Sequence, residues 1–76
     1  GYVEMKMQDG SSYNGNYANG EFNGRGIYQW KNGASIEVEW VDSQINGYGI
    51  HIKPDGTQEE GQFLSNSDGT FSLVND

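Results

Sequence analysis

Cysteine is absent from this 76-residue chain, and histidine and proline occur once each, as His51 and Pro54. Without cysteine the chain forms no disulfide and offers no thiolate to a metal ion. A single histidine does not supply the several convergent ligands that a metal site needs. No apolar run approaches the ~20 residues of a transmembrane helix. The composition therefore disfavours disulfide-stapled scaffolds, metalloenzymes and chains that cross a membrane as a helix.

Basic residues are also scarce, with four lysines and arginines against eleven aspartates and glutamates and a net charge of −7. Nucleic acids and anionic lipid headgroups attract clusters of lysine and arginine, and the sequence offers no such cluster. We therefore expect no binding to nucleic acid and weak or absent binding to anionic membranes. A basic or amphipathic segment of a protein partner suits the charge better, although an acidic surface also simply keeps a protein in solution.

Glycine and aromatic residues, in contrast, recur with a period of 23 residues. The matching positions are Gly24 and Gly47, Gly26 and Gly49, the aromatic series Tyr17, Trp40 and Phe63, and the turn dipeptides Asp9-Gly10, Asn32-Gly33 and Asp55-Gly56. A fixed period of this length indicates a stack of like supersecondary units, in which each unit contacts its neighbours. Such folds usually serve as surfaces and spacers.

Each unit is predicted to be a β-hairpin. Ile36, Val38 and Trp40 alternate with Glu37 and Glu39, which places the three apolar side chains on one face of a strand. Asn-Gly and Asp-Gly pairs, which supply the positive φ of hairpin turns, occur eight times. The sequence therefore predicts an all-β fold, an elongated antiparallel β-hairpin ribbon of six or seven strands. The strands are expected at residues 2–7, 12–18, 25–31, 34–41, 48–53 and 58–64, with a seventh at 70–74, and residues 18–25 are expected to form a glycine-rich turn.

The first full copy of the unit resembles the repeat of the MORN (membrane occupation and recognition nexus) family. The residues that carry the resemblance are Tyr13-Asn-Gly15-Asn-Tyr17, Asn23-Gly24-Arg-Gly26-Ile-Tyr28 and Asn32-Gly33. A second copy keeps Trp40, Asn46-Gly47-Tyr-Gly49 and Asp55-Gly56 of the family pattern. It departs from that pattern at Ile36, Val38 and His51. The resemblance implies one domain, 1–76, made of a partial repeat (1–12), two repeats (13–35 and 36–58) and a partial repeat with a C-terminal cap (59–76).

Residue types that carry chemistry are few and scattered. His51 stands where Tyr28 stands one repeat earlier, so we expect its ring to fill an aromatic column rather than to act as a catalyst or ligand. Glu37 and Glu39 share a strand face, but the spacing of a calcium loop is missing and no nucleophile completes a site. A solvated acidic face is the better interpretation. We therefore expect no enzymatic activity, no cofactor and no bound metal.

Aromatic side chains are the strongest candidates for a binding site. The expected partner-binding residues are Tyr17, Tyr28, Trp30, Trp40 and Phe63. One interpretation makes these rings the core, each packing on the next hairpin. The other leaves some of them exposed as a groove that grips a peptide, often a helix. A single-layer ribbon has two faces and cannot bury both without a partner. The two interpretations are therefore compatible if the inner rings pack in the core and the outer rings are exposed to a ligand.

The opposite face of the predicted ribbon carries Ile27, Ile50 and Ile52, which a fully solvated face would not need. An exposed apolar patch of this kind usually marks an interaction site.

The two ends of the ribbon are expected to be caps. Val3 aligns with Gly26 and Gly49 of the interior repeats, and Phe71 aligns with them if one residue is deleted near Ser67. Met5 and Leu73 then align with Tyr28 and His51. Larger side chains at these places would cover the outermost hairpins, as terminal repeats must, and would leave the aromatic middle as the partner surface.

The favoured function is a non-catalytic structural scaffold or protein–protein interaction module within a larger assembly. The resemblance places it inside the cell, in the cytoplasm or cytoskeleton, because the family occurs in cilia, protist cytoskeletons and junction complexes. The alternative is a targeting or regulatory appendage of a larger enzyme, such as a lipid kinase or a lysine methyltransferase. A third hypothesis is a glycan-binding repeat, which also uses aromatic hairpins with glycine turns but has a shorter period.

Overall fold

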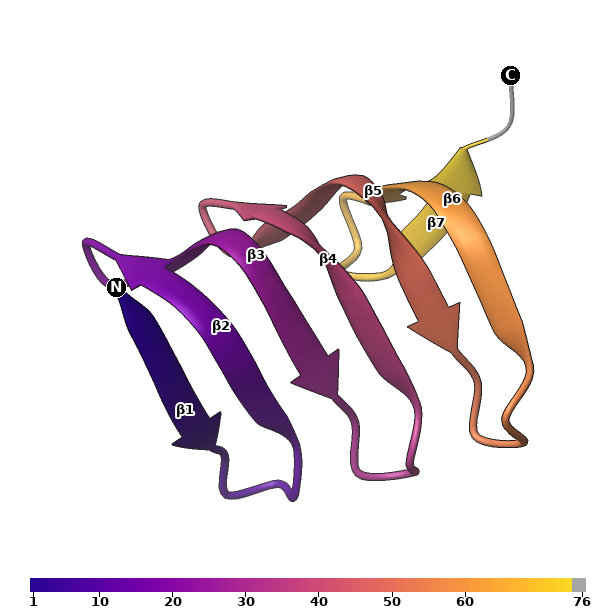
Figure 1. The fold of residues 1–76 in the computed structure, drawn as a ribbon, viewed down its shortest axis with the longest axis horizontal. Coiled ribbons are helices and arrows are strands. Elements are labelled where there is room, and N and C mark those ends of the chain that lie inside the picture. Colours follow the sequence, from indigo (N-terminus) through magenta and orange to yellow (C-terminus); the bar gives the residue numbers. More distant parts are fainter. Residues whose placement is uncertain (75–76) are drawn as a thin grey trace.

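Seven strands form one open antiparallel sheet in the computed structural model, which describes residues 1–74 (Figure 1). The strands are β1 (Tyr2–Lys6), β2 (Ser12–Ala18), β3 (Glu21–Gln29), β4 (Ser35–Val41), β5 (Gln44–Ile52), β6 (Gln58–Ser65) and β7 (Phe71–Val74). Their order in the sheet is their order in the sequence, so each connection is a hairpin. The predicted all-β hairpin ribbon is confirmed. In residues 1–74, no helix has the length and apolar character needed to cross a membrane.

Two of the hairpin connections are tighter than predicted. Asn19 and Gly20, with φ of 55° and 81°, join β2 to β3, and Asp42 and Ser43, with φ of 50° and 63°, join β4 to β5. Positive φ at both central residues defines the type I′ turn, whose twist matches that of the strands it connects. The long turn predicted at 18–25 is therefore wrong. β3 and β5 each begin four residues earlier than expected.

The connections at the opposite end of the sheet share one side-chain device. In each of them an Asp or Asn Oδ1 accepts a hydrogen bond from the backbone N–H two residues later, an arrangement that mimics a backbone turn. The pairs are Asp9 and Ser11 at 2.9 Å, Asn32 and Ala34 at 3.0 Å, and Asp55 and Thr57 at 2.9 Å. Asp68 and Thr70 form a fourth such pair at 3.0 Å, in the β6–β7 connection.

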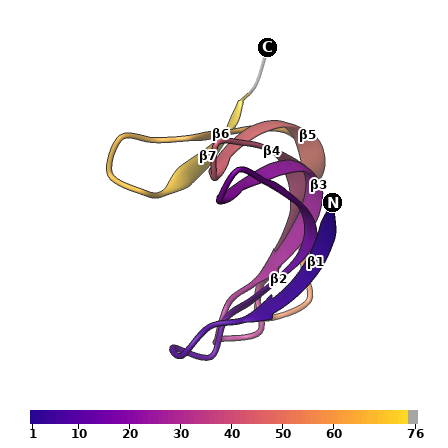
Figure 2. The same cartoon turned by 90° about the vertical axis from the view of Figure 1, so that its left-hand side faces the viewer.

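The sheet is strongly curved along its strands (Figure 2). Tyr13 on β2 pairs with Tyr28 on β3, yet its ring stacks on that of Phe22, six residues away on β3, at a centroid distance of 3.8 Å. Six residues of a straight strand span about 20 Å, so β3 bends toward its aromatic side. The pairing register shifts between Gly15 and Tyr17 of β2 and between Glu37 and Trp40 of β4. The extra residues lie in the partner strands, β3 and β5, and bulges of this kind bend the strand that carries them. The concave aromatic side is termed the inner face, and the convex side the outer face.

The core lies on the inner face. Its buried residues are Tyr13, Ile36, Val38, Trp40, Ile45 and Phe63. Gly26 passes so close beneath the Tyr13 ring that an added Cβ would lie 2.6 Å from ring atoms Cε1 and Cζ. Glycine at this position therefore allows the ring to pack directly on the backbone.

The N-terminal edge has the predicted alignment. Val3 pairs with Gly15 and Met5 pairs with Tyr13, and both side chains pack against the core. Gly26 and Tyr28 occupy the corresponding positions one repeat later, where they pair with Val38 and Ile36.

The C-terminal edge departs from the predicted alignment. Phe71 pairs with Ser65 and Leu73 pairs with Phe63, so neither occupies the level predicted for it. The cause is the longer turn at residues 66–70, which stands where the earlier repeats have a two-residue turn and shifts the register. Both side chains nevertheless pack against the core.

Candidate functional site

A hollow of about 220 Å³ opens on the inner face of the sheet. Its apolar lining comes from four strands and from the connection that follows β3: Phe22, Tyr28, Trp30, Trp40, Ile45 and Phe71. Ser43, Ser65 and Gly69 complete the rim. This site is termed the aromatic hollow.

The β6–β7 hairpin supplies one wall of the aromatic hollow. Its connection projects over the concave side of the sheet (Figure 2). It brings the ring of Phe71 onto that of Trp30, with centroids 5.6 Å apart and planes inclined by 22°. The Phe71 ring also meets His51 edge-on at 5.0 Å. The hollow is therefore enclosed by residues distant in sequence, and no single repeat contains it.

Trp40 is held rigidly at the buried side of the aromatic hollow. It is 6% exposed, and its indole N–H donates a hydrogen bond of 3.1 Å to the carbonyl of Gly26. Its ring meets Phe22 and Tyr13 edge-on at 5.6 and 5.8 Å. Burial raises the pKa of Tyr13 above its ordinary 10.0, so the phenol stays protonated and donates to the carbonyl of Asn16 at 2.7 Å.

The exposed walls of the aromatic hollow are Tyr28 and Trp30. Both are half-buried, and their rings lie 5.1 Å apart at 60°. The Tyr28 hydroxyl donates to Ser11 Oγ at 3.0 Å, and Phe71 holds Trp30 from the other side. These contacts orient both rings before any partner binds.

Polar groups at the rim are already engaged within the sheet. Ser43 Oγ accepts a hydrogen bond from the backbone N–H of Phe22 at 3.0 Å, and Ser65 Oγ accepts one from Ile45 at 2.8 Å. The two serines occupy comparable places in successive repeats and tie neighbouring hairpins together. The aromatic hollow therefore offers a ligand aromatic rings beside a polar rim, and none of the described residues that line it is charged.

Three of the five predicted site residues, Tyr28, Trp30 and Trp40, come together in the aromatic hollow. Tyr17 is half-buried and lies outside it, next to the Phe22 ring at 6.0 Å. Phe63 is 1% exposed. Its ring is covered by β7, so it belongs to the core and presents no surface to a partner.

Sequence reasoning missed Phe22, Ile45 and Phe71 as lining residues. Phe22 and Ile45 follow the two type I′ turns. Phe22 lies in the predicted turn at 18–25, and Ile45 lies between the predicted strands at 34–41 and 48–53. Had Asn19-Gly20 been taken as a complete two-residue turn, period-two alternation from Phe22 through Tyr28 would have placed Phe22 on the inner face. No sequence signal places Phe71, because its position depends on the shifted register of β7.

His51 fills an aromatic column, at the place where the preceding repeat has Tyr28. Its ring lies edge-on to Trp30, Phe63 and Phe71. Its Nδ1 is 3.5 Å from Glu59 Oε1, whose other oxygen is 3.7 Å from Lys53 Nζ. Residues 1–74 contain no group of three histidine, aspartate or glutamate side chains arranged to hold a metal ion.

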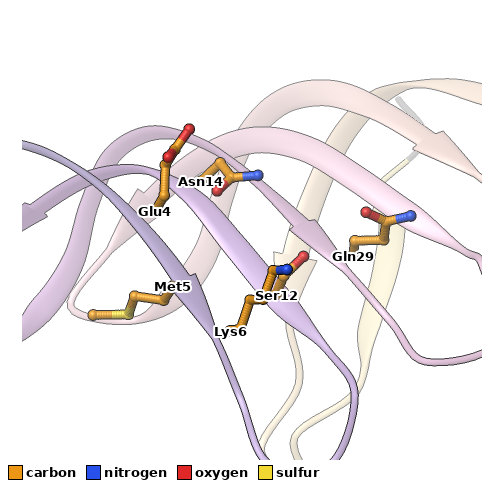
Figure 3. A pocket seen from close by; sticks show the side chains of 6 residues that line it. All are labelled: Glu4, Met5, Lys6, Ser12, Asn14 and Gln29. Carbon is orange, nitrogen blue, oxygen red and sulfur yellow. The ribbon is translucent and has the colours of Figure 1, made fainter.

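A second hollow, of about 480 Å³, lies near the N-terminal edge and is polar (Figure 3). Its lining residues are Glu4, Met5, Lys6, Ser12, Asn14 and Gln29. Met5 points away from the polar side chains in Figure 3, as expected for a neighbour of Glu4 in a strand. The remaining groups are amides, a hydroxyl and two opposite charges, so they form a mixed polar surface rather than a site of one charge.

The family model of the MORN repeat matches residues 13–35 and 39–58, which together make up more than half of the chain. No curated protein sequence matches the chain. The second match begins after Ile36 and Val38, where the sequence departs from the repeat pattern. Both matched segments line the aromatic hollow: the first contributes Phe22, Tyr28 and Trp30, and the second contributes Trp40 and Ile45.

Proposed function

This chain belongs to the MORN repeat family, and we propose that it is a non-catalytic interaction module that holds a segment of a protein partner in the aromatic hollow, as part of a larger assembly. Repeats of this family are interaction modules rather than catalytic domains. The observation that carries the proposal is the hollow itself, because it is open on one side and walled by aromatic rings.

The orientation of the walls supports a binding role. Tyr28 is held by Ser11 and Trp30 by Phe71, so a partner does not have to order these rings on binding. Side chains that are fixed beforehand lower the entropic cost of association. Tryptophan and tyrosine in such pockets contribute a large share of the binding energy of protein interfaces.

The shape and lining of the hollow indicate the kind of segment that it accepts. A concave site of about 220 Å³ with aromatic walls and a polar rim suits one or two apolar side chains on a protruding element. The chain around it has a net charge of −7, which favours basic residues next to those apolar ones. An amphipathic segment with a basic flank has both properties.

The proposal is tested by selecting peptides from a random phage-displayed library on the 76-residue chain. The Kd of each selected peptide is then measured for the wild type and for Trp30→Ala. We expect Trp30→Ala to weaken the Kd by about ten-fold or more, because it removes an aromatic wall. The melting temperature should fall by only a few degrees, because Trp30 is half-buried.

Two controls make the test decisive. Leu64→Ser, on the outer face and 43% exposed in the wild type, should leave the affinity of the selected peptides unchanged. The two indole N–H resonances, from Trp30 and Trp40, should both shift when a selected peptide is added. Unchanged affinity for Trp30→Ala together with unshifted indole signals would show that the aromatic hollow is not the docking site. If Trp30→Ala unfolds the chain, the indole shifts of the wild type decide the question.

A further inference from the structure

The outer face carries a row of side chains that alternates between isoleucine and glutamate from strand to strand. The register places Ile27 on β3 opposite Glu37 on β4, Glu37 opposite Ile50 on β5, and Ile50 opposite Glu60 on β6. Residues paired in this way point to the same face of the sheet. The four residues are termed the outer row.

The isoleucines of the outer row are not needed by the core, which lies on the other face. Ile27 is 40% exposed. A hollow of about 140 Å³ lies between Ile27, Glu37, Ile50 and the neighbouring Ile52. Ser35 and Gln58 complete the lining, which is mainly aliphatic carbon on a convex surface that faces solvent. The size of this hollow suits one aliphatic side chain from outside.

Negative charge is concentrated on the same face. Strand alternation puts one strand glutamate, Glu59, on the inner face and the others on the outer face. The outer ones are Glu4, Glu21, Glu37, Glu39 and Glu60. Arg25 Nε lies 3.9 Å from Glu37 Oε2, but both side chains are nearly half exposed. An exposed ion pair of this length is weak, so Glu37 remains available to a basic partner.

We propose that the outer row docks a helix of a protein partner that presents aliphatic and basic side chains alternately along one stripe. Neighbouring strands lie about 4.8 Å apart, so Ile27 and Ile50 are separated by about 10 Å with Glu37 midway. Residues i, i+3, i+7 and i+10 of a helix form a stripe with steps of about 5 Å, from the rise of about 1.5 Å per residue. Aliphatic residues at i and i+7 with lysine or arginine at i+3 and i+10 match the row in both spacing and charge.

The curvature of the sheet is compatible with this geometry. The strands bend along their own length (Figure 2), while they lie side by side across the sheet (Figure 1). A helix laid across the strands therefore follows the row without having to bend. Because the aromatic hollow lies on the opposite face, this second site does not depend on the first.

The experiment uses a synthetic helical peptide with leucine at i and i+7 and lysine at i+3 and i+10, titrated into the chain by calorimetry. A second peptide carries glutamate in place of both lysines. We expect the lysine peptide to bind and the glutamate peptide not to bind. The double variant Ile27→Ser, Ile50→Ser should weaken the Kd of the lysine peptide by about ten-fold. Glu37→Gln with Glu60→Gln should also weaken it, and added salt should weaken binding to the wild type.

The matched control is the double variant Val41→Ser, Leu64→Ser. These two aliphatic side chains are exposed to a similar extent, 46% and 43%, and lie on the outer face but outside the row. This control variant should leave the Kd of the lysine peptide unchanged. The melting temperature of each variant confirms that it is folded.

Three outcomes would overturn the proposal. The first is equal binding of the two peptides, or binding that the row variants do not change. The second is loss of lysine-peptide binding in Trp30→Ala but not in the row variants, which would move the peptide to the aromatic hollow. The third is a wild-type dimer that Ile27→Ser, Ile50→Ser converts to a monomer, which would identify a second copy of the chain as the occupant.

Discussion

Single residues decide how closely the inner rings approach the sheet. At Gly26 the backbone of β3 runs directly under the Tyr13 ring. Tyr13 cannot move aside, because its hydroxyl donates to the carbonyl of Asn16 and its ring is stacked on Phe22. Because Gly26 has no side chain, the Tyr13 ring and the Phe22 ring stacked on it can pack directly against the sheet at this place.

The first prediction concerns this contact. Gly26→Ala should lower the free energy of unfolding by about 1–3 kcal/mol, the usual cost of overpacking a core, as measured by urea denaturation. The nearest neighbour of the added methyl group is the Tyr13 hydroxyl. In the double variant with Tyr13→Phe, the effect of Gly26→Ala should therefore be smaller than in the wild type. Strict additivity of the two changes would show that the Tyr13 hydroxyl is not the obstacle.

At the scale of elements, strands in which apolar and charged residues alternate regularly could be predicted from the sequence. The glycine-containing starts of β3 and β5 could not. Ile36, Val38 and Trp40 alternate with charged residues, and β4 lies within one residue of its predicted bounds. The start of β3 contains Asn23 and Gly24, which are typical of turns, so the sequence predicts a turn at 18–25 instead of a strand. In the structure, Gly24 and Gly26 instead lie within the strand, where it bends.

Turns that contain an aspartate give the second prediction, which concerns acid stability. Hydrogen bonds from the side chains of the following Ser or Thr residues hold the pKa of Asp9, Asp55 and Asp68 below the ordinary 3.8. A lowered pKa in the folded state means that these carboxylates stabilise the fold above the unfolded pKa. Their contribution is lost as the pH falls through the folded pKa.

Urea unfolding from about pH 6 to about pH 2 should therefore show a decline in stability that is smaller in the triple variant Asp9→Asn, Asp55→Asn, Asp68→Asn. The variant should fold, because Asn32 already accepts the corresponding hydrogen bond in its own turn. An equal decline in variant and wild type would contradict the assignment.

The whole molecule is a single curved layer with two chemically different faces. The inner face holds the core and the aromatic hollow, and the outer face holds most of the strand glutamates and the outer row. Curvature and the arching β6–β7 hairpin bring the seven strands into 32 × 25 × 22 Å. Packing rings against one another on the concave side gives a thin sheet a core without a second layer.

The candidate site was only half accessible to sequence reasoning, and the division has a physical cause. The period of 23 residues identified Tyr28 and Trp40, because equivalent positions of stacked units share a face. Strand alternation placed Trp30 on the same face as Tyr28. The burial of Phe63 and the contribution of Phe71 depend on how the last hairpin folds over the sheet. That hairpin breaks the period, so the pattern of the repeats carries no information about it.

The third prediction belongs to the whole molecule and concerns membranes. With a net charge of −7 and scattered basic residues, the chain should not sediment with anionic phosphoinositide-containing vesicles at about 0.15 M salt. Glu37→Lys with Glu60→Lys adds two charges at each position, taking −7 to −3, and should increase sedimentation. Robust sedimentation of the wild type would show that the local arrangement of its basic residues outweighs the net charge.

The unequal distribution of glutamates between the faces has a kinetic consequence. Among the strand residues, the outer face carries five glutamates against Lys6 and Arg25, a net −3, while the inner face carries Glu59, a net −1. The layer therefore has an electric dipole normal to the sheet. The field of that dipole exerts a torque on the molecule as a cationic body diffuses toward it, and turns the convex side forward before contact. Encounters are thus biased in orientation, most strongly in dilute electrolyte, where the field extends beyond the width of the layer itself.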